Sequence, residues 1–250
     1  MLTNIRIVLV NTSHPGNIGG VARAMKNMEL RRLYLLDPLM FPDSEATARA
    51  SGADDLLTNA VICHSLDEAL MGCHLVVGTT ARTRHLRWPQ LWPKACAERV
   101  LSATQQGHEV AILFGREHSG LTNEELERCH YTVSIPCNPD FSSLNIAAAV
   151  QVISYELYCA VTQSSPVPPI STPAEDEQWV TYEAMENLYA HLEQTLVDIA
   201  FIEAGKPRNV MRRLRRLFSR TQLDVNEVNI LRGILTAVQQ RLERVVNRER

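Results

Sequence analysis

Short apolar runs recur along the first 136 residues, and each has the length of a β-strand. They are IRIVLV (5–10), LYLLD (33–37), AVICH (60–64), LVVGTT (75–80), VAILFG (110–115) and YTVSIP (131–136). Segments with helical spacing of apolar residues lie between several of them, at 19–28, 65–72, 93–106 and 122–129. Strands that alternate with helices predict an α/β fold with a mostly parallel sheet covered by helices on both faces.

The pattern changes after residue 161. The segment 142–161 contains no helix breaker and predicts a buried helix that ends this first part. The following stretch is rich in proline, serine and threonine and ends in acidic residues, which is typical of a linker. We therefore expect a first domain over 1–162, a linker over 163–178 and a second domain over 179–250.

The second domain is predicted to be a small helical extension. Three sets of apolar residues recur at helical spacing: Met185, Leu188, Leu192, Leu196 and Ile199; Val210, Met211, Leu214, Leu217 and Phe218; and Val228, Leu231, Leu235, Val238 and Leu242. Asp224 with Glu227 predicts a capping box at the last helix, as Thr122 with Glu125 does in the first domain.

Charge divides the chain in the same way. The formal net charge is -3, but residues 206–250 hold 12 Lys and Arg against 4 Asp and Glu, which leaves 13 against 24 for residues 1–205. An acidic body with a basic end predicts that the end contacts a polyanion such as nucleic acid. A solvated charged helix surface and a membrane-surface helix are the alternatives.

Several classes of protein and site are not indicated. The sequence contains neither a signal-peptide pattern nor a run of about 18 apolar residues, so we expect a cytoplasmic protein without a membrane partner. Its six cysteines form no CxxC pair and its histidines no HxxxH pair, so we expect reduced thiols and no metal site.

The segment NTSHPGNIGGVARAM (11–25) is a glycine-rich candidate for ligand binding. It lacks the Lys and the hydroxyl of a P-loop. A dinucleotide fingerprint is closer, since Asp37 follows at a suitable distance, but Gly16, Gly19 and Gly20 do not have the GxGxxG spacing.

Two later segments resemble this one in placement, because each is a polar loop that follows a strand: LFGREHSGLTNEEL (113–126) and IPCNPDFSSLNIAAAV (135–150). Together and in this order, the three segments resemble the motifs of the SPOUT class of RNA methyltransferases, the TrmH-like 2'-O-methyltransferases. The resemblance covers about residues 1–160. The long tail is similar to that of bacterial members that methylate cytidine or uridine at nucleotide 32 of the tRNA anticodon loop.

The resemblance implies a C-terminal trefoil knot in the α/β domain, a homodimer, tRNA as partner and S-adenosyl-L-methionine as cofactor. The residues that match the cofactor site are Thr79, Thr80, Ala81, Gly115, Ile135, Ser142, Ser143 and Leu144. Methylation of another tRNA or rRNA nucleotide, and an RNA-binding homologue without activity, remain alternatives.

Five residues match the family's catalytic positions. Arg23 is expected to activate the ribose hydroxyl electrostatically, because a guanidinium has only hydrogen-bond donors and cannot act as a base. Asn17 and Asn145 would orient the motif loops or the ribose, Glu117 would pair with Arg23 or position RNA, and Ser143 would cap a helix or contact donor and RNA. For His14, a hydrogen bond within its own loop is favoured over general-base catalysis.

Two basic segments are expected to bind RNA. In ARTRHLRWP and the residues after it, Arg82, Arg84 and Arg87 stand with Trp88 and Trp92, a pattern that suits an unpaired RNA strand. An ordinary exposed loop with a buried Trp is the alternative. The tail helix offers Arg212, Arg213 and Arg216, together with Arg208, Arg215 and Arg220.

Overall fold

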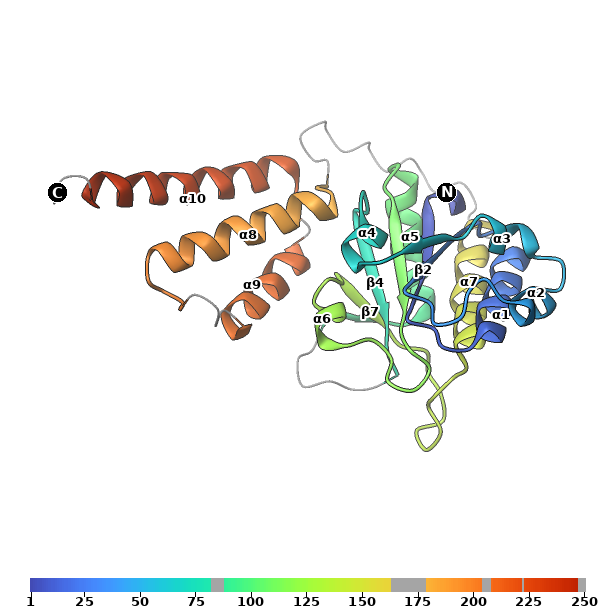
Figure 1. Ribbon diagram of the computed structural model, residues 1–250. Coiled ribbons are helices and arrows are strands. Elements are labelled where there is room, and N and C mark those ends of the chain that lie inside the picture. Colours follow the sequence, from blue (N-terminus) through green and yellow to red (C-terminus); the bar gives the residue numbers. More distant parts are fainter. Residues whose placement is uncertain (82–87, 163–178, 204–207, 222, 247–250) are drawn as a thin grey trace. The chain divides into compact units, whose positions relative to one another are not determined.

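The computed structural model describes residues 1–81, 88–162, 179–203, 208–221 and 223–246 (Figure 1). The chain divides into two compact units, Met1–Ile170 and Ser171–Arg250. The linker expected at 163–178 lies outside the described residues, so the domain boundaries proposed from sequence stay a prediction.

The first unit is built on a seven-stranded parallel sheet. Its strands are β1 (Ile5–Val10), β2 (Arg32–Leu36), β3 (Val61–Cys63), β4 (Leu75–Thr79), β5 (Gln90–Leu91), β6 (Val110–Phe114) and β7 (Tyr131–Val133). They lie in the order β3-β2-β1-β6-β4-β7-β5, and every pairing is parallel. All residues of β1 and β6 are buried, because these strands lie inside the sheet and helices cover it.

Helices connect the strands. They are α1 (Pro15–Asn27), α2 (Ser44–Ala50), α3 (Asp54–Thr58), α4 (Leu66–Leu70), α5 (Pro93–Gln105), α6 (Asn123–Leu126) and α7 (Ile146–Thr162), after a short 3-10 turn at Leu2–Asn4. Helix α7 packs against both α1 and α5, so these three helices form one layer (Figure 1).

The predicted α/β class with a parallel sheet is confirmed, and all six predicted strands are present. The seventh strand, β5, was not predicted because its two residues carry no periodic signal. The capping box of Thr122 and Glu125 is confirmed at the start of α6. The trefoil knot stays a prediction.

The glycines of the opening motif serve helix packing. Gly19 and Gly20 lie inside α1, whereas a ligand-binding loop was considered from the sequence. A Cβ on Gly19 would lie 2.1 Å from the carbonyl oxygen of Ala46 in α2, and one on Gly20 would lie 3.0 Å from the Cβ of Ala147 in α7. Glycine therefore lets α1 approach both neighbouring helices closely.

The second unit consists of α8 (Tyr182–Asp198), α9 (Arg208–Thr221) and α10 (Val225–Val246), which confirms the three predicted helices. Its buried core comprises Val180, Met185, Leu188, Tyr189, Met211, Leu223 and Val228. Ile199 and Leu217 were expected on the apolar stripes but are 43% and 44% exposed. Asp224 and Glu227 exchange hydrogen bonds of 2.7 and 3.0 Å, as the predicted capping box requires.

All six cysteines are unpaired, and four of them are buried. Within the described ranges, no helix has both the length and the apolarity needed to cross a bilayer. The same residues contain no group of three or more His, Cys, Asp or Glu side chains arranged to hold a metal ion.

Candidate active site

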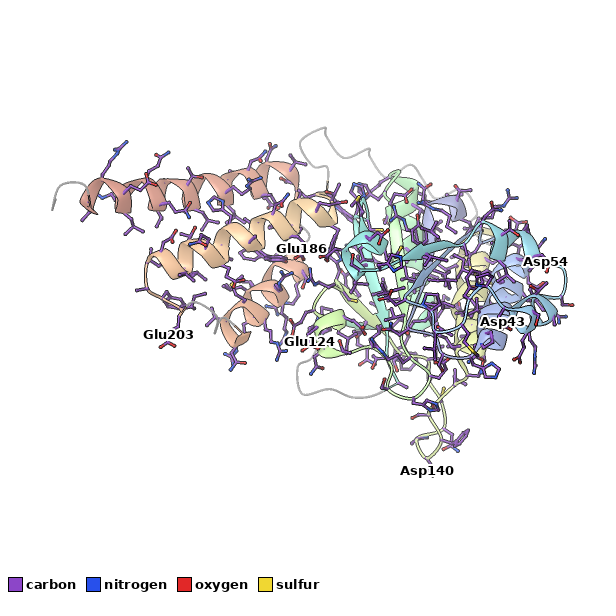
Figure 2. All side chains as sticks on the ribbon, in the orientation of Figure 1. Asp43, Asp54, Glu124, Asp140, Glu186 and Glu203 are labelled. Atoms are coloured by element: carbon purple, nitrogen blue, oxygen red, sulfur yellow. The ribbon has the colours of Figure 1, made fainter. Side chains whose placement is uncertain are left out.

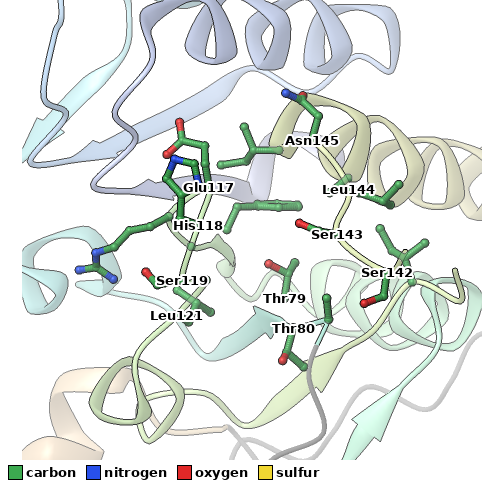
Figure 3. A pocket seen from close by; sticks show the side chains of 18 of the residues that line it. Thr79, Thr80, Glu117, His118, Ser119, Leu121, Ser142, Ser143, Leu144 and Asn145 are labelled. Atoms are coloured by element: carbon green, nitrogen blue, oxygen red, sulfur yellow. The ribbon is translucent and has the colours of Figure 1, made fainter. Parts of the chain in front are cut away.

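A cavity of about 300 Å³ lies where the segments that follow β4, β6 and β7 meet (Figure 3). These strands are neighbours and parallel, so their carboxyl ends lie along one edge of the sheet, where ligands of open α/β folds bind. Every residue matched to the cofactor site lines this cavity: Thr79, Thr80, Ala81, Gly115, Ile135, Ser142, Ser143 and Leu144.

Gly115 is required by the protein's own backbone. After β6 the chain turns back on itself, and Arg116 and Gly120 exchange backbone hydrogen bonds of 3.2 and 2.9 Å. A Cβ on Gly115 would lie 2.2 Å from the carbonyl carbon of Gly120 and from the amide nitrogen of Leu121. Glycine at 115 thus permits the tight loop that forms one wall of the cavity.

Glu117 ties the loop after β6 to the loop after β1. Its carboxylate accepts hydrogen bonds from the Ser13 amide (3.2 Å) and hydroxyl (3.1 Å), and from the His14 amide (3.3 Å). The side-chain amide of Asn17, in the first turn of α1, donates a further bond of 3.0 Å. One carboxylate therefore organises the start of the first motif.

Asn17 continues this connection to the third motif. Its side-chain oxygen accepts a 2.9 Å hydrogen bond from the Asn145 side-chain amide. The Asn145 oxygen in turn accepts from the amide of Ala147 at 2.9 Å, which caps the N-terminus of α7. Glu117, Asn17 and Asn145 thus form a continuous hydrogen-bonded line, named here the Glu117–Asn17–Asn145 line, that joins all three motif loops.

The hydrogen bonds also set the charge of Glu117. Partial burial favours its neutral form, but the bonds from Asn17, Ser13 and His14 outweigh burial and hold the pKa of Glu117 below its ordinary value. The carboxylate is therefore ionised at neutral pH.

Ser143 faces the same hollow as Thr79, whereas Asn145 and Glu117 lie farther toward its edge (Figure 3). The helix predicted from residue 142 begins at Ile146, and Asn145 occupies its cap. The capping alternative for Ser143 is therefore wrong, and its hydroxyl is left on the cavity wall.

Arg23 lies on the exposed side of α1 and does not line the cavity of its own chain. It also makes no ion pair with Glu117, because that carboxylate is engaged by Ser13, His14 and Asn17. The pairing considered from the sequence is therefore not formed.

His14 caps α1. Its Nδ1 accepts a hydrogen bond of 3.1 Å from the amide of Gly16, which agrees with the local role favoured from the sequence. The same nitrogen lies 4.0 Å from a carboxylate oxygen of Glu45.

Sequence reasoning missed Arg116, although it stands in the second motif. Arg116 lines the cavity, pairs with both carboxylate oxygens of Glu125 at 3.0 and 3.1 Å, and donates to the Asn11 side chain. Phe114 and Val133 add apolar lining from the strand ends. Their buried strand pattern gave no sign that they border a cavity.

In the second unit, Arg215 has a structural role. Its guanidinium makes two hydrogen bonds to Glu186, at 2.5 and 2.8 Å, and lies 4.3 Å from the centre of the Tyr189 ring. Burial disfavours its charged form, but the bonds and charge of Glu186 outweigh burial and raise the Arg215 pKa. The structure therefore gives Arg215 a partner within the helical unit, and its contact with RNA stays a prediction.

The other tail arginines differ in exposure, and the side chain of Arg208 lies outside the described residues. Arg213 and Arg220 are exposed, and Arg212 and Arg216 are half-buried. Arg82, Arg84 and Arg87 lie outside the described residues. Beside them, Trp88 is buried at 8% exposure whereas Trp92 is 68% exposed, so only Trp92 presents its ring.

We predict that Glu117→Gln lowers the free energy of unfolding at pH 7 by about 1 kcal/mol, because hydrogen bonds to a charged acceptor are lost. The depressed pKa means that this stabilisation is present above the unfolded-state pKa and disappears as pH falls through the folded-state value. Urea unfolding of wild type and variant at several pH values from 7 to below 4 measures the difference, with the exposed Glu98→Gln as control. If the difference in unfolding free energy between wild type and Glu117→Gln did not become smaller in acid, the stabilising role of the ionised Glu117 carboxylate would be contradicted.

Comparison with known proteins agrees with this geometry. Residues 4–155 match the SpoU rRNA Methylase family, and residues 183–248 match the C-terminal domain of tRNA methyltransferase TrmJ. The second match falls on the helical unit.

Two curated relatives are similar over nearly the whole chain. The tRNA (cytidine/uridine/adenosine-2'-O-)-methyltransferase TrmJ of Pseudomonas aeruginosa is 53% identical, covering 96% of this chain and 95% of its own. The tRNA (cytidine/uridine-2'-O-)-methyltransferase TrmJ of Pectobacterium atrosepticum is 52% identical, with 96% and 98% covered.

Among solved structures, TrmJ from Z. mobilis ZM4 superposes with a TM-score of 0.80 at 31% identity, covering 94% of this chain and 98% of that one. The resemblance found in the three sequence motifs is thereby confirmed. The chain belongs to the SpoU methylase family and carries a TrmJ-type C-terminal domain.

Proposed function

We propose that this protein transfers a methyl group from S-adenosyl-L-methionine to the ribose 2'-hydroxyl of cytidine or uridine at position 32 of the tRNA anticodon loop. The observation that carries the proposal is that the second and third motifs and the end of β4 line one cavity, and that the first motif is hydrogen-bonded to both of these motifs, in a chain that matches a methylase family and the TrmJ tail. The two TrmJ relatives support tRNA as substrate.

The cavity fits the proposed cofactor. Its volume of about 300 Å³ lies at the lower end of the range for small-molecule sites, which suits a folded ligand. Apolar strand ends at Phe114 and Val133 can contact a purine, and the hydroxyls of Thr79 and Ser143 can bond polar groups. When bound, the cofactor would supply a methyl group from its sulfonium sulfur, which would leave as a neutral thioether.

The chain's own residues would position the ribose. The Glu117–Asn17–Asn145 line fixes the loops, and Ser143 can hydrogen-bond RNA at the cavity wall. Arg23 would bind an RNA phosphate and the target hydroxyl together, so that its charge favours the alkoxide while the phosphate or another group takes the proton.

We further propose a cytoplasmic homodimer in which Arg23 of one copy completes the cavity of the other. Arg23 is exposed and does not line its own cavity, which supports a contribution from a second copy. Tyr155, which is 52% exposed on α7, offers aromatic surface that such a copy would cover.

The proposal is tested by incubating the purified protein with labelled S-adenosyl-L-methionine and unmodified tRNA, then mapping the product by mass spectrometry. We expect a methylated ribose at nucleotide 32. A methyl group on another nucleotide would favour a different site within the same class. Absence of transfer would leave an RNA-binding homologue, and a methylated base would exclude 2'-O chemistry.

We predict that Arg23→Ala reduces methyl transfer by at least about a hundredfold, since electrostatic stabilisation of a developing charge is typically worth that much. Calorimetry should find S-adenosyl-L-methionine binding nearly unchanged, because the proposed partners of Arg23 are the RNA phosphate and the target hydroxyl rather than the cofactor. Co-expression with Ser143→Ala should restore partial activity if Arg23 acts across subunits. Full activity of Arg23→Ala would remove this residue from the reaction.

We predict that replacing both Arg212 and Arg213 by Ala weakens tRNA binding and lowers the salt dependence, by about 0.7 to 0.9 in log-log slope for each lost phosphate contact. Filter binding from 50 to 200 mM salt measures this, with exposed Arg241→Ala on α10 as the matched control. Arg215→Ala should instead destabilise the helical unit, because it removes the pair with Glu186. An unchanged salt slope in the double variant would exclude this face of α9 from RNA binding.

A further inference from the structure

Phe141 is the most exposed large apolar side chain of the described residues, at 77% exposure. It lies in the loop between β7 and α7, beside Asp140, which marks the projecting tip of this loop in Figure 2. An exposed aromatic ring offers a large, rigid apolar face that a ligand can contact.

The loop holds Phe141 in a defined place. Asn138 accepts two hydrogen bonds of 3.0 Å. Its side-chain oxygen accepts one from the backbone amide of Asp140, and its backbone carbonyl accepts the other from the amide of Phe141. Beyond the ring, Asn145 fixes the other end of the loop through Asn17 and Ala147.

Phe141 is also next to the cavity along the chain. Ser142 and Ser143 follow it directly and line the cavity, and two residues span at most about 7 Å. A ribose presented to the cavity therefore brings its own base, or an adjacent one, within reach of the ring.

The loop's charge argues for contact with a base. Residues 135–146 contain no Lys or Arg, and Asp140 would repel a phosphate. The proposed homodimer also brings a second copy to this cavity, and burial of Phe141 by that copy is the alternative that the measurement of oligomeric state below tests.

A second exposed ring is present at the same edge of the sheet. Trp92 is 68% exposed and follows β5, the strand beside β7. The amide of Ser134, at the start of the Phe141 loop, donates to the carbonyl of Leu91 at 3.1 Å, so the two segments are directly linked.

We propose that Phe141 is a positioning residue that stacks on an unpaired base of the substrate RNA, at or next to the methylated nucleotide. The inference rests on the proposed function for the identity of the RNA. Stacking is tolerant of base identity, and each stacked base typically contributes enough to change affinity by roughly tenfold. The base would thereby hold its ribose at the cavity.

The test compares Phe141→Leu, which keeps an apolar side chain, with Phe141→Tyr, which keeps the ring. Binding of unmodified tRNA by fluorescence anisotropy, and KM against kcat for methyl transfer, are measured for each. We expect Phe141→Leu to weaken binding and raise KM by about tenfold with a smaller change in kcat, and Phe141→Tyr to retain wild-type values.

Abasic nucleotides separate stacking from other effects. Two tRNAs are compared, one that lacks the base at position 32 and one that lacks the base at position 33. Phe141→Leu should bind as tightly as wild type to the tRNA that lacks the stacking base, because that RNA has no base for the ring to contact. The inference would be overturned if Phe141→Leu weakened binding equally for all of these RNAs. It would also be overturned if light scattering showed that Phe141→Leu changes the oligomeric state of the protein. Met71→Ala, which removes an apolar side chain that is 58% exposed just before β4, is the control.

The readouts distinguish the two proposals. If wild type methylates tRNA but Phe141→Leu binds and reacts normally, the inference fails and the proposed function stands. If wild type transfers no methyl group while binding still depends on the ring, the proposed function fails and the stacking role stands.

Discussion

The carboxylate of Glu117 is the interaction on which the candidate site depends. It accepts hydrogen bonds from the loop after β1 and from Asn17, which in turn binds the Asn145 cap of α7. Segments separated by about a hundred residues are thereby held beside one cavity. Because hydrogen bonds to an ionised acceptor are about twice as strong as neutral ones, a single ionised group can organise three loops.

The sheet was predictable because a buried parallel strand is a continuous apolar run, as in Ile5–Val10 and Val110–Phe114. The structural role of the glycines in the motifs could not be predicted from the sequence. Gly19 and Gly115 belong to motifs that suggest ligand binding, yet both are required by close approach of the protein's own backbone. Such approaches arise from tertiary packing and leave no local pattern.

The candidate site was predictable as a set of loops, but the partners within it were not. Glu117 could have paired with Arg23, and only the fold shows that Ser13, His14 and Asn17 occupy its oxygens. In the tail, Arg215 has the same sequence context as Arg216, and Glu186 on another helix sets it apart. Sequence periodicity identifies a helix face, whereas the partner of each charge depends on the neighbouring helix.

The most direct test of the Glu117–Asn17–Asn145 line is S-adenosyl-L-methionine binding by an Asn17→Ala variant, measured by titration calorimetry. Asn17 does not line the cavity, so it can affect the ligand only by ordering the loops that do. Our account predicts a folded variant that binds about two- to tenfold more weakly, with a larger entropic cost, since the ligand must then order these loops itself. Unchanged affinity and entropy in a folded variant would contradict the account.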